Sequence, residues 1–280
     1  MKRTIRKYGM IERNDRIAIG VSGGKDSITL MYLLKKITEN RPNIELIVVT
    51  IDEGIKGYRN ESIPIAQKNA KELEIEHKIV SFKEIIGYGL DELLQVAETK
   101  VVKTKRKRLR ACAYCGVFRR SILNKMAREL GASKVATGHN LDDDIQAILM
   151  NLMRADIEKE SRLGPKTEPR HSKLVARIKP LREVPEREVA LYALLNGIEV
   201  HLEECPYAGE SFRQVIRNWL NETEVKYPGT KFSILRGFDK LLPILKERFG
   251  HPVLNNCSMC GEPTQYKVCK ACELLRGLNI

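Results

Sequence analysis

The sequence predicts an α/β protein in which a mostly parallel sheet carries helices on both faces, with a C-terminal helical segment and a small four-cysteine tail. Short apolar runs alternate with segments of helical periodicity over residues 17–153, which is the pattern of strands joined by crossover helices. Beyond Pro180 the pattern turns helical, and Pro185 and Glu186 form a good helix start. Residues 256–280 are compact and rich in cysteine.

The individual elements follow from the hydrophobic pattern and the turn residues. Residues 155–173 are polar and contain Gly164, Pro165 and Pro169, so we expect a surface loop there, either disordered or in contact with substrate. Strands are expected at residues 17–21, 44–51, 76–82 and 134–137, and helices at residues 4–13, 62–73, 113–130, 142–153, 211–225 and 231–248, with a further helix after residue 27.

Composition limits the function classes. The 280 residues carry 49 Lys and Arg against 36 Asp and Glu, a net charge of +13, which favours a polyanionic partner, with nucleic acid as the first candidate. No apolar run approaches a membrane span, and nothing near the N-terminus reads as a secretion signal. Seven cysteines, an odd number, do not suit a disulfide framework, so we expect a reducing, cytoplasmic compartment.

The strongest motif is a glycine-rich loop between the first strand and the following helix: Ser22, Gly23, Gly24, Lys25, Asp26 and Ser27. Its glycines let backbone N–H groups face a phosphate at the positive end of the helix dipole, and Lys25 adds a positive charge. The spacing is neither that of the Walker loop nor that of the dinucleotide fingerprint. The order of residues in this loop resembles the PP-loop of ATP pyrophosphatases, which cleave ATP between the α and β phosphates.

Two acidic segments follow other strand ends, where open α/β sheets place their ligands. Asp52, Glu53 and Gly54 follow the second strand and either border the nucleotide or cap the next segment. Gly138 to Asp144 follows the fourth strand. Its three aspartates either favour the dipole of the next helix or serve a catalytic or Mg²⁺-binding role.

Three cysteines form a candidate reaction centre. Cys112 and Cys115 make a Cys-x-x-Cys pair at a predicted helix start, and Cys205 stands before Pro206, a setting also found among iron–sulfur ligands. Spacing alone leaves three readings open: an iron–sulfur cluster, redox-active thiols that carry a persulfide, and a zinc site or inert thiols.

Four further cysteines form two Cys-x-x-Cys knuckles separated by eight residues: Cys257, Cys260, Cys269 and Cys272. Four thiolates suit a closed tetrahedral Zn²⁺ site, which we expect to be structural because no ligand position stays open. Another metal or a redox pair is the alternative.

A basic run precedes the first cysteine pair. Its six cations attract phosphates and predict RNA contact, a solvated flexible run being the other reading: Lys103, Lys105, Arg106, Lys107, Arg108 and Arg110. Arg119 and Arg120, one turn past Cys115, face either ATP or RNA.

Taken together, these motifs resemble the tRNA 2-thiouridine synthetases of the TtuA/NcsA type, over nearly the whole chain. The carriers are residues 22–27, 52–55, 112–116, 138–143 and 204–208 with the C-terminal knuckles. Residues 115–120 and 149–154 look more like the branch that thiolates wobble uridine 34, known as NcsA or cytosolic thiouridylase subunit 1. The branch that acts on uridine 54 is the alternative.

The resemblance implies a reaction and its site. In that family the uracil O2 is adenylated with ATP, pyrophosphate leaves, and sulfur displaces AMP. It implies that Cys112, Cys115 and Cys205 hold a [4Fe-4S] cluster. It places the glycine-rich loop, Ile51, Arg119, Gly138 and Asp143 near ATP, with Asp143 as the Mg²⁺ ligand or catalytic acid. It further suggests a homodimer, with tRNA as partner and either sulfide or a ubiquitin-like carrier as sulfur donor.

The expected organisation has four parts: a basic helix in residues 1–14, a PP-loop catalytic domain in residues 15–180, a helical extension carrying Cys205 in residues 181–250, and a zinc ribbon in residues 251–280. Family members usually begin with another cysteine-rich ribbon, which does not precede the basic helix in this sequence. Competing functions are a zinc-containing module that binds ATP and RNA without thiolation, a PP-loop ligase for a small molecule, and a cytidine-32 thiolase. Cys205, the basic run and the C-terminal knuckles argue against these three in turn.

Overall fold

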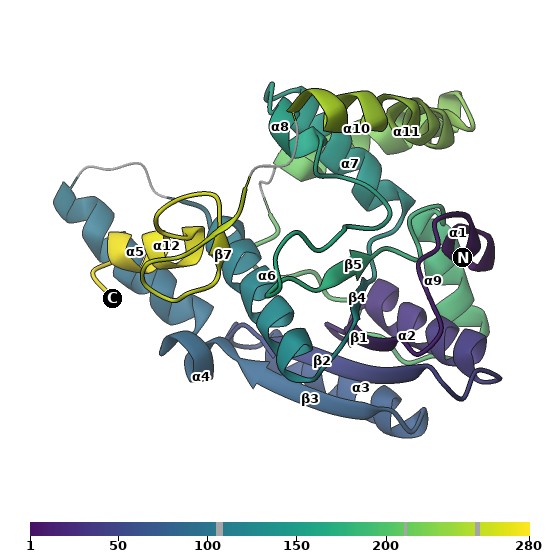
Figure 1. Cartoon of the computed structure of the whole chain (residues 1–280), viewed down its shortest axis with the longest axis horizontal. Coiled ribbons are helices and arrows are strands. Elements are labelled where there is room, and N and C mark those ends of the chain that lie inside the picture. The colour runs from purple at the N-terminus through teal and green to yellow at the C-terminus, as the bar shows by residue number, and fades with distance from the viewer. Residues whose placement is uncertain (105–108, 210–211, 250–252) are drawn as a thin grey trace.

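The computed structural model describes residues 1–104, 109–209, 212–249 and 253–280, with the side chains of residues 100–104 excepted. These ranges contain a five-stranded parallel sheet in the order β3-β2-β1-β4-β5 (Figure 1). The strands are β1 (Arg16–Gly20), β2 (Glu45–Asp52), β3 (Glu76–Ser81), β4 (Lys134–Thr137) and β5 (Ala176–Ile178). The parallel α/β fold expected from the alternating pattern is confirmed.

One face of the sheet is covered by the helices that follow β1 and β2 and by a helix that follows β5. Ile17, Ile19 and Val48 point to this face and pack with buried residues of α2 (Lys25–Thr38), α3 (Arg59–Glu72) and α9 (Glu186–Leu195). The side chains alternate between the two faces because successive residues of a strand point in opposite directions.

The opposite face carries the neighbouring strand positions. Ala18, Ile47 and Val49 pack there against α5 (Leu90–Thr104), α6 (Ala111–Glu129) and the C-terminal α12 (Lys270–Gly277). Leu274 of α12 and Leu278, its C-cap residue, join the same core. Helices therefore cover both faces, as the pattern predicts for a parallel sheet. Figure 1 shows α12 lying beside α6 at the end of the molecule away from α1 (Lys2–Lys7).

A separate hydrophobic cluster joins α7 (Leu141–Leu152) to the helical extension. Ile145 and Ile148 of α7 pack with Ile216 of α10 (Phe212–Lys226) and Leu235 of α11 (Thr230–Phe249). The extension therefore rests on the helix that follows β4, at the upper edge of the view in Figure 1. No helix in the described part of the chain is long and apolar enough to cross a membrane.

Several expected bounds shift in the structure. The expected strand at residues 76–82 ends at Ser81, because Ser81 and Glu84 form a capping box that starts α4 (Phe82–Ile86). The N-terminal helix ends at Lys7 rather than residue 13. The expected loop at residues 155–173 contains α8 (Ile157–Glu160), in which Glu160 is fully buried. The four-part division of the chain stays a prediction.

Candidate functional site

The glycine-rich loop forms the turn from β1 into α2. Gly23 has φ +92°, and a Cβ on it would lie 2.2 Å from the carbonyl oxygen of Ser62, so only glycine fits. Ser27 Oγ accepts from the Ser22 N–H at 3.0 Å and donates to Gly24 O at 3.0 Å. Gly24 is the N-cap residue of α2 and has no side chain to occupy the first N–H groups. The loop therefore presents the features of an anion site at a helix N-terminus.

The loop after β4 packs directly on this turn. A Cβ on Gly138 would lie 2.9 Å from Ser27 N, so Gly138 also requires glycine. Asn140 Nδ2 donates to Asp26 Oδ1 at 3.0 Å, which joins the two loops. The segments at residues 22–27 and 138–143 thus form one site at the carboxyl edge of the sheet, as open α/β sheets favour.

Asp143 lies in the first turn of α7. Its carboxylate accepts from the Asn140 N–H at 3.3 Å in a capping box and lies 3.5 Å from Arg213 Nη1. Burial raises the pKa of Asp143 to about 6, against the lowering effect of Arg213 and with a further contribution from Asp26. The helix-capping reading and a role at the nucleotide are both compatible with this geometry, so the catalytic assignment of Asp143 stays a prediction.

Lys25 is held by two carboxylates. Its Nζ lies 2.9 Å from Asp26 Oδ2 and 2.7 Å from Glu186 Oε1 of α9. Burial by itself lowers the pKa of Lys25, but Asp26 and Glu186 raise it above the ordinary value, so the ammonium stays charged. From the sequence, Glu186 is recognisable only as part of a helix start, because nothing local indicates that α9 meets the loop.

A buried arginine, Arg59, holds the acidic segment at the end of β2 in place. No motif in the sequence indicates this role of Arg59. Arg59 Nε lies 2.8 Å from Glu53 Oε2, and its other nitrogens donate to Ile51 O at 2.5 Å and Ser22 O at 2.8 Å. Arg119 Nη1 lies 3.6 Å from the other Glu53 oxygen. Glu53 therefore serves as a counterion for two arginines, while the Ile51 carbonyl is already occupied.

The three cysteines come from two segments. Cys112 and Cys115 lie in the first turns of α6, and Cys205 follows the segment that pairs with the glycine-rich loop. The Cys112 thiol lies 3.6 Å from the carbonyl oxygen of Tyr207, two residues past Cys205. Among the residues that the structure describes, these three sulfurs do not form a set lying within 4.8 Å of one another.

Two thiols of this group, those of Cys115 and Cys205, have raised pKa values. Burial raises the pKa of Cys115 to about 11, although Arg119 opposes the shift, and burial likewise raises the pKa of Cys205. The neighbouring cysteines raise these pKa values further: Cys112 and Cys205 act on Cys115, and Cys112 acts on Cys205. These thiols therefore stay protonated at neutral pH until a metal or a strong electrophile displaces the proton.

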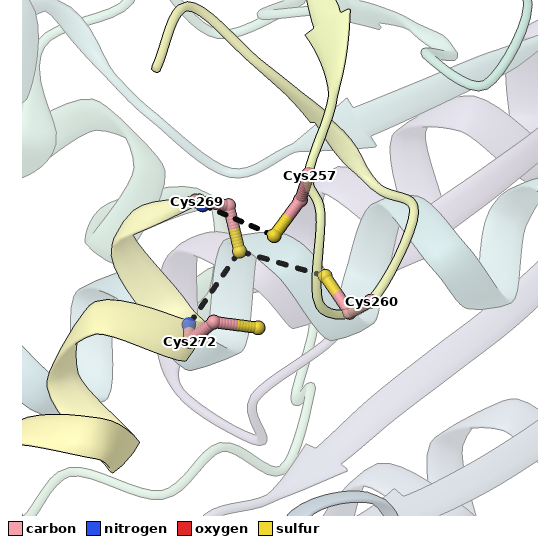
Figure 2. A group of neighbouring side chains, drawn as sticks. All are labelled: Cys257, Cys260, Cys269 and Cys272. Carbon is pink, nitrogen blue, oxygen red and sulfur yellow. Dashed lines mark hydrogen bonds between the residues drawn. The ribbon is translucent and has the colours of Figure 1, made fainter. Parts of the chain in front are cut away.

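The four C-terminal cysteines lie together, as Figure 2 shows, with all four sulfurs within 4.8 Å of one another. Cys257 and Cys260 flank the turn after β6 (Asn255–Asn256), and Cys269 caps α12, whose first turn carries Cys272. Burial opposes ionisation of Cys257, but the backbone N–H groups directed at its sulfur lower the pKa to about 6. The predicted four-cysteine cluster is confirmed.

This cluster is fixed to the main body by polar contacts. Arg128 of α6 pairs with Glu262 at 2.6 Å, just before β7 (Pro263–Thr264), and Lys173 Nζ donates to Gly261 O at 2.7 Å. The cluster thus supports α6 at the end opposite Cys112 and Cys115.

The basic run falls mostly outside the description. Residues 105–108 lie outside the described ranges, and Lys103 lies in α5 with its side chain outside them. Arg110 is exposed and precedes α6 as its N-cap residue. RNA contact through Lys103, Lys105, Arg106, Lys107, Arg108 and Arg110 therefore stays a prediction.

The parallel sheet and the glycine-rich turn at its carboxyl edge are the features of PP-loop proteins. The family model of the PP-loop domain matches residues 1–224. The NcsA tRNA 2-thiolation protein of Haloferax volcanii is 38% identical over 100% of this chain and 89% of that protein. The tRNA-5-methyluridine(54) 2-sulfurtransferase of Pyrococcus horikoshii is 38% identical over 98% of this chain and 82% of its own length.

A solved structure extends the likeness to three dimensions. The U34-tRNA thiolase NcsA of Methanococcus maripaludis, solved with its [4Fe-4S] cluster, has a TM-score of 0.83 and 38% identity over 100% of this chain and 87% of that chain. The chain belongs to the TtuA/NcsA family of PP-loop tRNA thiolation proteins. The resemblance drawn from the motifs is thereby confirmed.

Proposed function

We propose that this protein is a tRNA-uridine 2-sulfurtransferase that consumes ATP and releases AMP and diphosphate. The observation that carries the proposal is a physical link between the glycine-rich loop and the cysteines. The His201 N–H donates to Gly23 O at 2.9 Å, and four residues later the same segment delivers Cys205 to the group that contains Cys112 and Cys115. A site that activates a base and a site that supplies sulfur must be adjacent, and this link supports that arrangement.

ATP would bind along the carboxyl edge of the sheet. Backbone N–H groups at the start of α2 and the charged Lys25 would hold phosphates, and Asp143 would hold Mg²⁺. The uracil O2 would attack the α phosphate, releasing diphosphate and converting a poor leaving group into AMP, which sulfur then displaces. The residues proposed for ATP are Ser22, Gly23, Gly24, Lys25, Asp26, Ser27, Ile51, Arg119, Gly138 and Asp143.

The donor set of the cysteine group fits a [4Fe-4S] cluster. Cys112, Cys115 and Cys205 supply thiols only, and their spacing exceeds what one metal ion needs, which favours a polynuclear centre. Bound there, the cluster would supply an iron without a protein thiol that can carry sulfide. Arg119, which opposes the rise that burial causes in the pKa of Cys115, would stabilise the thiolates. The persulfide reading is the alternative at these residues.

Cys257, Cys260, Cys269 and Cys272 fit Zn²⁺, because four clustered thiolates with N–H donors to sulfur make a closed tetrahedral donor set. We assign this zinc a structural role. It shares no residue with the proposed reaction centre.

Wobble uridine 34 is the proposed position, supported by the likeness to the U34-tRNA thiolase. Uridine 54 is the second candidate, because the Pyrococcus horikoshii enzyme named for that position is as similar as the NcsA protein, at 38% identity. We further propose a cytoplasmic homodimer, in line with relatives named as cytoplasmic, with sulfide or a ubiquitin-like carrier as the sulfur donor.

The test is reconstitution without oxygen. Protein loaded with iron and sulfide should convert uridine to 2-thiouridine in a tRNA transcript when ATP and sulfide are added, and mass spectrometry of nuclease fragments maps the position. Cys205→Ala should lower the rate by about 100-fold or more, because it removes a ligand rather than a supporting group.

The matched control is Glu203→Ala, an exposed change two residues before Cys205 that should leave the rate unchanged. Full activity of Cys205→Ala would overturn the proposed mechanism. Binding of ATP and tRNA without any thiolated nucleoside would favour the non-catalytic module instead.

A further inference from the structure

Two arginines beside the cysteine group have no counterion. Among the residues that the structure describes, the guanidinium groups of Arg120 in α6 and Arg177 in β5 make neither a hydrogen bond nor an ion pair with an acidic side chain. The Nε atom of Arg177 is buried and has no hydrogen-bond partner. An arginine left in this way carries a desolvation cost with no compensating contact.

The backbone places these two side chains opposite each other. Arg128 Nη1 donates to Lys173 O at 2.8 Å, and one helical turn back Asn124 accepts from the Val175 N–H at 2.9 Å. Four helix residues advance about 6 Å and two strand residues about 6.6 Å. Four residues further toward the start of α6 stands Arg120, and two residues further along the strand segment stands Arg177. The same spacing therefore sets Arg120 beside Arg177.

Both side chains lie on the α6 side of the sheet. Val175 packs in the core beneath α6, and Arg177, two residues on, points to the same face, whereas Ile178 faces the helices on the other side. Arg120 folds back along its helix, since a Cβ on Gly116 would lie 3.2 Å from Arg120 Nη1. Gly116 directly follows Cys115, so the pair borders the cysteine group.

The two positive charges of the pair repel each other. Burial lowers the pKa of Arg120, and Arg177 and Arg119 lower it further; burial also lowers the pKa of Arg177, which Asp144 only partly offsets. Arg120 is nonetheless solvent-exposed, so the protein surrounds it without covering it. This combination is that of a basic site whose charge a ligand can reach.

The nearby carboxylates are engaged with other cations. Asp144 pairs with Lys179 and Arg182, both at 2.7 Å, and Glu262 pairs with Arg128. Glu53 pairs with Arg59 and Arg119. These carboxylates therefore neutralise other cations of this region and leave Arg120 and Arg177 for an external anion.

We propose that Arg120 and Arg177 together bind a phosphate group of a substrate beside the cysteine group. Two planar guanidinium groups facing one space suit the oxygens of a phosphate, which accept several charged hydrogen bonds at once. The phosphate belongs either to ATP or to the RNA backbone next to the modified base, and this choice rests on the proposed function.

The experiment measures binding without turnover. The variants are Arg120→Gln and Arg177→Gln. The control Lys125→Gln removes one positive charge from the helix that carries Arg120, where Lys125 pairs with Glu129 at 3.9 Å. ATP affinity is measured by calorimetry, and affinity for a tRNA transcript by fluorescence anisotropy over a range of salt.

Each Gln variant should lower the affinity for one of the two ligands, ATP or tRNA, by about tenfold or more. Loss of tRNA affinity with a salt slope lower by about one, at unchanged ATP affinity, identifies an RNA phosphate. Loss of ATP affinity alone identifies a nucleotide phosphate. Unchanged affinity for both, or an equal loss in Lys125→Gln, would overturn the proposal.

Thermal unfolding separates binding from a structural role. Arg177→Met should keep or raise the Tm, because it removes two facing like charges, while it loses the affinity that Arg177→Lys largely retains. A Tm lowered in Arg177→Met, with ligand affinities intact in the folded protein, would make the arginine structural. These binding measurements do not depend on thiolation. A wild-type protein that fails the separate thiolation assay would refute the proposed function but would leave the phosphate-binding result unchanged.

Discussion

At the scale of single residues, the site depends on positions where the backbone leaves no room for a side chain. Gly23 would place a Cβ 2.2 Å from Ser62 O, and Gly138 would place one 2.9 Å from Ser27 N. In both cases the obstacle is backbone, which cannot rotate away. The absence of a side chain at Gly23 therefore sets the fit of the glycine-rich loop against α3, and its absence at Gly138 sets the fit of the loop after β4 against the glycine-rich loop. Substitution at either position displaces the loop that would hold the phosphates.

Glu160 leads to a prediction about pH. It is fully buried, and neither of its carboxylate oxygens has a hydrogen-bond partner in the described part of the chain. Burial raises its pKa to about 7 from an ordinary value of 4.5. The folded state therefore binds more protons than the unfolded state between these values, so this group's contribution to stability falls as pH rises from 4.5 to 7.

Glu160→Gln should remove that pH dependence. Relative to wild type, the variant should gain up to about 3 kcal/mol in the free energy of unfolding between pH 4.5 and pH 8, measured by denaturant titration. The difference between two pH values cancels any constant effect of the amide. Glu158→Gln, on the exposed side of the same helix, should show no such gain. Parallel curves for Glu160→Gln and wild type would show that the carboxyl is already ionised at pH 5.

Residues whose role in the site depends on contacts between distant segments could not be predicted from the sequence. The glycine-rich loop and the cysteine groups are local motifs, so their chemistry is readable from spacing. Arg59, Glu186 and Arg177 belong to segments whose sequence carries no motif, and they matter only because the fold brings them to the loop or to α6. The roles of Glu53 were left open for the same reason.

At the scale of elements, the hydrophobic pattern gave most strands and helices to within a few residues. It missed β5, since three residues are too few to show alternation. It also passed over α5, although Leu90, Leu93, Leu94 and Ala97 have helical spacing and are buried. The basic residues that follow directly on this segment indicate RNA contact rather than a helix.

The C-terminal element yields a prediction about metal. Cys260 is the exposed member of the four-cysteine group, so Cys260→Ser removes a ligand with little loss of packing. We expect zinc content to fall from one ion per chain, and the Tm to fall by about 5 °C or more, because α12 is no longer fixed on α6. Elemental analysis and thermal unfolding measure both.

Ser258→Ala, in the same turn, is the control and should retain zinc. Iron in place of zinc in the wild type would contradict the assignment, as would a Tm that does not change when Cys260→Ser loses its metal. Loss of α12 docking should expose Leu274 and Leu278, which are buried against α6.

At the scale of the whole molecule, one buried ion network joins parts that are distant in sequence. Arg182 is completely buried and donates to Asp144 of α7 at 2.7 Å and to Asp239 of α11 at 2.6 Å. Tyr8, just after α1, donates to Asp239 at 3.0 Å. The N-terminal segment, the loop after β5 and the helical extension therefore share one set of charges, and the extension is positioned relative to the sheet.

Breaking this network should destabilise the molecule as a unit. Asp239→Ala leaves the buried Arg182 sharing Asp144 with Lys179, two cations against one carboxylate, and the loss should be about 3 kcal/mol in the free energy of unfolding. Lys240→Ala, exposed on the same helix, should change it little. The double variant Arg182→Met with Asp239→Leu should recover much of the loss, because it removes the unpaired charge together with its partner. Equal stability of Asp239→Ala and wild type would mean that solvent reaches Arg182 and replaces the carboxylate.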